Sequence, residues 1–294
     1  MTETAGRRQM GGCNTGRMQR AFAEVDVFTA VPYRGNPLAV VIDGSGLSTE
    51  DMQRFATWTN FSETTFLLPP TDSGADYAVR IFTTTTELPF AGHPTIGSCH
   101  AWLANGGVPQ HEDRIVQECG VGLVEIRRDG DGRLAFAAPP LLRDGPLEEA
   151  TVQAAADALG IGRGAVVASA WIDNGPGWLG ILLASAEEVL AITAGNTDLK
   201  IGVVGPYPDA APHAYEVRAF FPGVGATFED PVTGSLNASA AQWLIGSGRF
   251  TAPYVVSQGT AMGRAGQVFI STDPSGQVWV GGDAVTCVAG TVEL

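Results

Sequence analysis

The chain has 294 residues, of which 45% are apolar and 16% charged, a composition that excludes a disordered protein and indicates a compact one. Its length accommodates one large domain or two lobes of ordinary size. The formal net charge of −14 repels nucleic-acid phosphates and anionic lipid surfaces, so we expect no nucleic-acid and no membrane partner. A small anionic substrate remains compatible with this charge, because a helix N-terminus can attract it locally.

The cysteines and the N-terminal segment predict a cytoplasmic protein. Cys13, Cys99, Cys119 and Cys287 are scattered without a CxxC pair, which suits a reducing compartment. We expect Cys99 and Cys287, which sit among small apolar residues, to lie in the core. The first twenty residues carry arginines but no apolar stretch, so no secretory signal is predicted, and the longest apolar runs are too short to span a bilayer.

The first half of the chain alternates short strands with two helices. Residues 1–17 lack periodicity and are interpreted as a tail or a start extension, with Met18 as an equally good first residue. Ser48, followed three residues later by Asp51, predicts a helix N-terminus close to the capping-box pattern, with the helix running to about Trp58. A second helix is predicted from Pro94. Strands are predicted at residues 22–28, 38–42, 65–68, 77–83, 122–127 and 134–137.

The second half repeats this mixture after a joint rich in proline and glycine at residues 138–146. We expect a first lobe at 18–139 and a second at 140–294, with the last strand free to return to the first lobe. Helices are predicted at 147–159 and ending near 245. Strands are predicted at 166–172, 179–183, around 203, and at 215–221, 253–257, 267–271, 277–281 and 284–288. Because these strands come as hairpins more than as alternating βα units, the predicted class is α+β.

Two sequence patterns suggest other functions and are set aside. Residues 175–180 match GxGxxG, but Asn174-Gly175 is a hairpin signal and the following residues continue a strand, so a nucleotide site is not predicted. His93 and His100 are the only close histidine pair and lack the three or four converging ligands of a metal site.

The most informative feature is a pattern that occurs twice. Residues 92–98 (Gly-His-Pro-Thr-Ile-Gly-Ser) and 229–235 (Glu-Asp-Pro-Val-Thr-Gly-Ser) each place a titratable residue before a proline and Gly-Ser at the same offset. An apolar segment with Trp-Leu follows each one. A proline preceded by a polar cap marks a helix N-terminus. If the halves are related, the two helix starts face each other across a cleft and form an anion-binding, acid/base site.

The residues of these two patterns are the first candidate site residues. Asp230 before Pro231 is either a simple N-cap or a site carboxylate, and the sequence leaves both interpretations open. His93 is not a favoured cap, and the positive end of a helix keeps its imidazole neutral and able to exchange a proton. Gly92 and Gly234 leave backbone N–H groups accessible to a carboxylate, and Ser235 adds a hydroxyl.

Glu63 is the third titratable candidate. It enters a predicted strand with apolar residues on both sides. One interpretation is an edge-strand carboxylate that points to water. If it points inward instead, burial raises its pKa and suits it to acid/base work near neutrality.

The order of several motifs resembles the phenazine-biosynthesis PhzF-like family from about residue 18 to the C-terminus. The matching segments are 26–29 (Asp-Val-Phe-Thr), 35–40 (Gly-Asn-Pro-Leu-Ala-Val), 62–66 (Ser-Glu-Thr-Thr-Phe), 87–95 (Glu-Leu-Pro-Phe-Ala-Gly-His-Pro-Thr), 229–235, 258–259, 263–264 and 280–282. The resemblance implies the diaminopimelate-epimerase-like fold, in which two pseudo-symmetric lobes each wrap a curved sheet around a central helix. It also implies a homodimer.

The resemblance further implies isomerisation of a small carboxylate without cofactor or metal. Glu63 then resembles the general acid/base that moves a proton between carbons of an unsaturated carboxylic acid, in a secondary-metabolite pathway. His93 and Asp230 resemble its polar partners, and Gly92, Gly234 and Ser235 resemble binders of the substrate. Racemases of this fold use a cysteine at each helix start, where this chain has His93 and Asp230, so a two-thiol racemase is not expected.

Three functional hypotheses follow. The first is an isomerase acting on a small carboxylate. The second is a same-fold enzyme with a different outcome, such as carbon–carbon cleavage or epimerisation. The third is a catalytically silent binding or scaffold protein, against which the joint presence of Glu63, His93, Asp230 and Ser235 counts.

Overall fold

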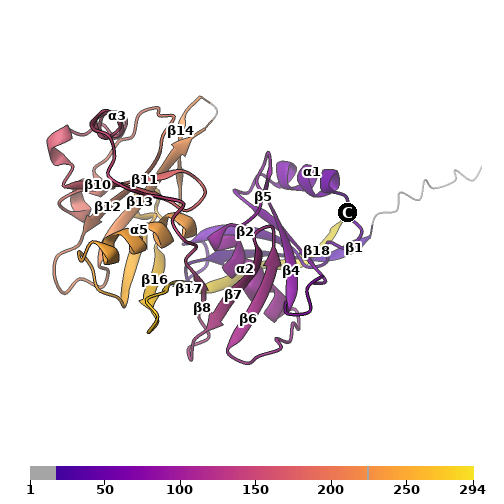
Figure 1. The fold of residues 1–294 in the computed structure, drawn as a ribbon. Helices are drawn as coiled ribbons and strands as arrows, with labels where there is room; N and C mark the ends of the chain where they lie inside the picture. The colour runs from indigo at the N-terminus through magenta and orange to yellow at the C-terminus, as the bar shows by residue number, and fades with distance from the viewer. Residues whose placement is uncertain (1–17, 224) are drawn as a thin grey trace, which may run out of the picture.

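The chain runs through the same order of strands and helices twice (Figure 1). A computed structural model describes residues 18–223 and 225–294, so the predicted tail at 1–17 lies outside the described residues. The first half comprises β1 (Gln19–Val27), β2 (Asn36–Val41), α1 (Thr49–Thr59), β3 (Thr64–Leu68), β4 (Tyr77–Phe82), β5 (Glu87–Leu88), α2 (Gly92–Ala104), β6 (Arg114–Cys119), β7 (Gly122–Arg128) and β8 (Leu134–Ala137).

The second half begins with an added strand and helix and then repeats that order. It comprises β9 (Arg143–Gly145), α3 (Glu149–Leu159), a short 3₁₀ turn (Arg163–Ala165), β10 (Ala168–Asp173), β11 (Trp178–Leu182), α4 (Ala186–Leu190), β12 (Lys200–Pro206), β13 (Tyr215–Pro222), β14 (Thr227–Asp230), α5 (Gly234–Gly246), β15 (Tyr254–Gln258), a second 3₁₀ turn (Thr260–Met262), β16 (Gly266–Thr272), β17 (Val278–Gly282) and β18 (Ala284–Glu293).

Strand pairing confirms the pseudo-symmetry. β1 and β2 pair antiparallel, β2 and β3 parallel, and β3 and β4 antiparallel, and the same senses recur for β10, β11, β12 and β13. The parallel pair of β4 with β6 has its counterpart in β13 with β15. The predicted α+β class, with a curved sheet around a central helix in each half, is therefore confirmed.

The central helices are α2 and α5, each thirteen residues long. Most residues of both helices are buried, including Ile96 and Cys99 in α2 and Leu236 and Leu244 in α5. A helix that is apolar around most of its circumference must lie inside a protein core. Each sheet wraps around its helix for this reason (Figure 1).

Three pairs of strands lie at the joint, and two of them connect the halves. β8 pairs antiparallel with β17, from Ala137 opposite Trp279 to Leu134 opposite Gly282. β9, the strand that follows β8, pairs with β10 in the second half. β18, the strand that follows β17, pairs with β1 of the first half. The final strand of the second half thus lies in the sheet of the first, while a boundary at residue 139 stays a prediction.

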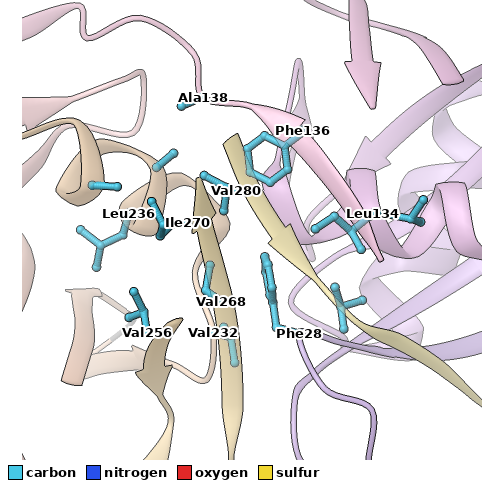
Figure 2. Packing of buried hydrophobic residues seen from close by; sticks show 14 of the residues in the cluster. Phe28, Leu134, Phe136, Ala138, Val232, Leu236, Val256, Val268, Ile270 and Val280 are labelled. Atoms are coloured by element: carbon cyan, nitrogen blue, oxygen red, sulfur yellow. The ribbon is translucent and has the colours of Figure 1, made fainter. Parts of the chain in front are cut away.

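The buried residues at this joint form one continuous apolar cluster. Figure 2 shows its members on β8, β16, β17 and α5, among them Leu134, Phe136, Leu236, Val268, Ile270 and Val280. Because the same cluster contains side chains of both halves, it fixes the relative position of the two central helices.

Several local predictions are confirmed and one is wrong. Ser48 caps α1, because its hydroxyl accepts a hydrogen bond from the Asp51 N–H at 3.1 Å. The GxGxxG segment comprises part of the turn between the antiparallel strands β10 and β11 and the first residues of β11, as its hairpin signal and the continuing strand indicate. Cys99 is buried, but Cys287 is only half-buried, because β18 exposes most of its residues.

Candidate active site

The N-termini of α2 and α5 touch each other. A Cβ atom on Gly92 would lie 2.9 Å from the Gly234 Cα, and one on Gly234 would lie 2.9 Å from the Gly92 Cα. Only glycine permits this approach of two backbones. The first-turn N–H groups of both helices, which lack partners within a helix, therefore lie next to each other. The helix starts face each other as predicted, but they are in direct contact and not separated by a cleft.

The register of the repeated pattern differs from the prediction. α5 begins at Gly234, so Asp230 is not its N-cap but the last residue of β14, and Pro231 precedes the helix. α2 begins at Gly92, so His93 lies in its first turn. The contact between the two glycines makes Gly92 the counterpart of Gly234, and hence His93 the counterpart of Ser235.

Glu63 points inward. It immediately precedes β3, and its Oε2 is closed off from solvent without a hydrogen-bond partner among the described residues. Oε2 lies 3.4 Å from the Nε2 of His93. Burial, and after it the negative charge of Asp230, raises the pKa of Glu63 to about 8. At neutral pH the side chain is therefore mostly a neutral carboxylic acid with a proton to exchange.

His93 is held as a neutral imidazole. Its side chain is buried, and burial lowers its pKa to about 3. One ring nitrogen, Nε2, faces Glu63, and the other, Nδ1, lies 3.4 Å from the Nδ2 of Asn36. The ring thus connects Glu63 to a polar network behind it.

Asp230 is joined to the first half through Asn36. The Asn36 Nδ2 donates to Asp230 Oδ1 at 3.0 Å and to the Val232 carbonyl at 2.9 Å. Burial raises the pKa of Asp230 to about 6, against the opposing hydrogen bonds from Thr233 and Asn36. Asp230 is therefore mostly ionised at pH 7, beside a Glu63 that is not.

Asn36 was missed as a site residue by the sequence reasoning. It is fully buried at the first position of β2, and its Oδ1 has no partner among the described residues. The available signal was an amide residue before a proline at the start of an apolar strand. Only the fold shows that β14, from the other half, ends beside it.

Ser235 lies in the first turn of α5, where two side chains of the β10–β11 turn hold it. Its Oγ accepts a hydrogen bond from the Trp178 Nε1 at 3.0 Å, and its carbonyl accepts one from the Asn174 Nδ2 at 2.9 Å. The hydroxyl proton of Ser235 donates to no group in the described part of the chain. It is free to bind a ligand beside the helix N-terminus.

Behind Asp230, Gln258 fixes the segment between β14 and α5. Its Oε1 accepts hydrogen bonds from the Thr233 N–H at 2.9 Å and from the Asn237 Nδ2 at 2.7 Å. Its Nε2 donates to the Thr233 Oγ1 at 3.0 Å, and that hydroxyl in turn donates to Asp230 Oδ2 at 2.5 Å. Asp230 is thus oriented from both sides, as acid/base positioning requires.

The predicted residues Glu63, His93, Asp230, Gly92, Gly234 and Ser235 come together where the two helix starts meet. Within residues 18–223 and 225–294, no three His, Cys, Asp or Glu side chains converge as ligands of a metal ion. None of the helices in this part of the chain is long and apolar enough to cross a membrane.

Comparison with known proteins identifies the family. Residues 25–290 match the model of the PhzC-PhzF family, the phenazine biosynthesis-like proteins. Antisense-enhancing sequence 1 of Schizosaccharomyces pombe is 38% identical over 92% of this chain and 98% of its own. Trans-2,3-dihydro-3-hydroxyanthranilate isomerase of Pseudomonas fluorescens is 30% identical, over 92% of this chain and 98% of its own.

Solved structures share the fold. A PhzF-family protein of Bacillus anthracis superposes with a TM-score of 0.79 at 21% identity, covering 94% of this chain and 99% of its own. A hydroxyproline epimerase of Agrobacterium vitis, with a TM-score of 0.55 at 14% identity over 94% and 91% of the two chains, has a related fold. The family model and the relatives named isomerases assign this fold, with its two facing helix starts, to the isomerase class. The chain belongs to the PhzF-like, phenazine biosynthesis-like family.

Proposed function

We propose that this chain is a cofactor-independent isomerase that moves a proton between carbons of a small unsaturated carboxylic acid. The reaction takes place where α2 and α5 meet, between the two halves. The observation that supports it most is the half-buried Glu63, whose Oε2 is closed off from solvent 3.4 Å from a neutral His93 and whose pKa is raised to about 8. A carboxyl group with a pKa near the working pH can both accept and return a proton.

The proposed reaction conserves atoms and electrons. The ionised form of Glu63 takes a proton from one carbon, the electron pair of that C–H bond shifts the neighbouring double bond, and the resulting carboxylic acid returns the proton to a second carbon. His93 and Asp230 orient the substrate and the carboxyl group. The first-turn N–H groups at Gly92 and Gly234, with the Ser235 hydroxyl, bind the substrate's polar groups.

The substrate class comes from chemistry shared with one relative. The Pseudomonas fluorescens protein is named for an isomerisation of trans-2,3-dihydro-3-hydroxyanthranilate, a ring-containing unsaturated carboxylic acid. We propose a compound of this kind, formed in secondary metabolism, for the present chain. A same-fold enzyme with another outcome, such as cleavage or epimerisation, would share the acid/base residues and differ in the substrate.

A silent scaffold is the less favoured alternative, although the name of the Schizosaccharomyces pombe relative does not describe an isomerase. A carboxyl oxygen that is buried without a hydrogen-bond partner, as Glu63 Oε2 is, lowers the stability of the folded state. A scaffold gains nothing from such a group, whereas an acid/base enzyme needs its shifted pKa.

The proposal is tested by isotope exchange. Turnover of a hydroxylated dihydroaromatic acid in deuterium oxide should label the product at one carbon, because the protonated Glu63 can exchange with solvent before it returns the proton. Glu63→Gln, which is nearly isosteric but cannot act as a base, should lose activity by at least about 10²-fold. Glu112→Gln, at an exposed position, serves as the matched control. Full activity in Glu63→Gln would rule out the mechanism.

A further inference from the structure

Lys200 is the only lysine in a chain that carries 16 arginines. Lysine and arginine serve solubility equally well at exposed positions. In this chain arginine occupies every basic position but one. An ammonium is a compact cation with three donors, whereas the guanidinium is a broad planar fork. Lys200 is therefore the one side-chain ammonium of the chain, with a donor geometry that no arginine supplies.

The fold places Lys200 beside the proposed substrate site. It is the first residue of β12, the strand that corresponds to β3, which Glu63 immediately precedes in the other half. Lys200 is paired with Trp178 across the parallel strands β11 and β12, so both side chains extend from the same face of the sheet. The Trp178 ring reaches the Ser235 Oγ on that face.

The ammonium group of Lys200 has capacity to bind a ligand. Its Nζ donates one hydrogen bond, to the Pro176 carbonyl at 2.6 Å, which leaves two N–H groups. No carboxylate oxygen of residues 18–223 and 225–294 forms an ion pair with it. The side chain is half-buried, so the charge is neither neutralised nor fully solvated.

The surroundings of Lys200 match an unsaturated, anionic ligand. The rings of Trp178 and Phe221, on the strands to either side of β12, approach to 6.4 Å between centroids. Asn174, in the same turn as Pro176, binds the Ser235 carbonyl through Nδ2, while its Oδ1 is buried without a partner among the described residues. Two aromatic rings, a cation without an ion-pair partner and an unused acceptor therefore gather around the β10–β11 connection, whose Asn174 and Trp178 contact Ser235 at the start of α5.

The charges of Asp230 and Lys200 favour one orientation of a bound carboxylate substrate. Asp230, whose side chain hydrogen-bonds to Asn36 of the first half, repels the substrate's carboxylate. Lys200 and the N-terminal end of α5 attract it. We propose that Lys200 binds the carboxylate of the substrate beside Ser235 and thereby sets which carbon of the substrate faces Glu63. This inference rests on the proposed function, since it assumes that the ligand is a carboxylic acid.

The test uses two probes that differ only in charge. 2-Aminobenzoate and its neutral amide, 2-aminobenzamide, are both fluorescent and can be titrated without turnover. Wild-type protein should bind the acid more tightly than the amide. Lys200→Met, which keeps an unbranched apolar stem, should weaken binding of the acid roughly 10- to 100-fold and of the amide less than about threefold, as expected for loss of a hydrogen bond between charged groups.

Arg54→Met, which removes an exposed cation on α1, controls for the change in net charge, and circular dichroism checks that each variant is folded. Equal weakening of acid and amide, an unchanged affinity for the acid, or wild-type protein that does not prefer the acid would each overturn the proposal. Glu63→Gln should bind the acid within about threefold of wild type, because the mechanism assigns Glu63 to proton transfer. The proposed contact between Lys200 and the carboxylate is thus tested separately from the proposed proton transfer by Glu63.

The single lysine permits a second, direct measurement. Reductive methylation with ¹³C-formaldehyde preserves the positive charge and labels only Lys200 and the N-terminal amine. The Lys200 methyl resonance, assigned by its absence in Lys200→Met, should shift on addition of 2-aminobenzoate and stay in place with 2-aminobenzamide. If the Lys200 methyl resonance does not shift at concentrations of 2-aminobenzoate that saturate the fluorescence titration, the proposed contact is wrong.

Discussion

Glu63 and His93 lie 3.4 Å apart, and burial drives their pKa values in opposite directions, to about 8 and about 3. Loss of solvent disfavours the charged form of each group, so the pair is neutral at pH 7 although a carboxyl and an imidazole in water would tend to form an ion pair. Asp230, with a pKa of about 6, is the group of the three that carries charge. The site therefore holds its exchangeable proton on Glu63.

This distribution of protons predicts an alkaline pH profile. Proton abstraction needs ionised Glu63, so kcat/KM should rise as the pH increases through about 8 and then level off. In Asp230→Asn the neighbouring negative charge is gone, the pKa of Glu63 is raised less, and the rise should move to lower pH. A rate profile over pH 5–10 for both proteins measures the displacement.

Asp209→Asn, at an exposed position, is the control and should leave the profile in place. Asp230→Asn should also reduce turnover, since Asp230 is proposed to orient the substrate. The variant should lose about 1–3 kcal/mol of stability at most, because Asn keeps an acceptor for Asn36 but not one for the Thr233 hydroxyl. A profile that stays at the wild-type pH, or that moves to higher pH, would contradict the proposed coupling between Asp230 and Glu63.

At the residue scale, sequence reasoning selected the titratable candidates but not the residues that hold them. Glu63, His93 and Asp230 stand next to proline, glycine or apolar residues in patterns that suggest chemistry. Lys200 carries no such local signal, and Asn36 carries only its place before a proline at the start of an apolar strand. Their significance depends on which strands become neighbours: β14 ends beside Asn36, and β11 runs beside Lys200. Pairing between distant segments cannot be derived from composition or periodicity.

At the scale of elements, the site depends on the contact between α2 and α5. Gly234→Ala should destabilise the protein by about 1–3 kcal/mol and lower activity strongly, because the added methyl must displace a backbone. Its Cβ would lie 2.9 Å from the Gly92 Cα and 3.0 Å from the His93 nitrogen, which moves the imidazole away from Glu63. Chemical denaturation and steady-state kinetics measure the two effects.

Gly246→Ala is the matched control within the same helix. A Cβ at Gly246 would meet no atom within 4 Å, and the alanine should leave stability equal or improve it by up to about 1 kcal/mol. If both alanine variants behave alike, the contact between the helix starts does not position the site.

The start of α5 also shows where prediction of elements from sequence stops. The sequence pattern predicts Pro231 as the first residue of a helix that Asp230 caps. The helix begins three residues later, at Gly234. The reason is tertiary: Asp230 is paired with Ala219 in the sheet, and Gln258 holds the segment that follows in a non-helical conformation. Local propensity was overridden by a strand and a buried amide. Ser48, whose cap depends on local contacts alone, was predicted correctly.

At the scale of the whole molecule, β18 ties the last residues to the first strand and leaves one edge of the sheet open. β18 pairs with β1, and in residues 18–223 and 225–294 its other edge has no partner strand. Residues 284–292 of this strand contain no charge and no proline, and residues 288–291 are exposed. An uncharged, exposed edge strand promotes aggregation unless it is covered.

We therefore propose that a second copy of the chain covers this edge, as a two-fold dimer in which β18 lies against its own counterpart. A closed two-fold pair is the commonest arrangement of soluble oligomers, and it would leave no open strand at this side. Light scattering at micromolar concentration should give about twice the 30.6 kDa mass of one chain. Val288→Lys should place two like charges at the proposed axis and shift the mass toward that of a single chain, whereas Val31→Lys, in an exposed loop, should not. A single-chain mass for the wild type would refute the dimer. A stable dimer in Val288→Lys would assign it to another surface.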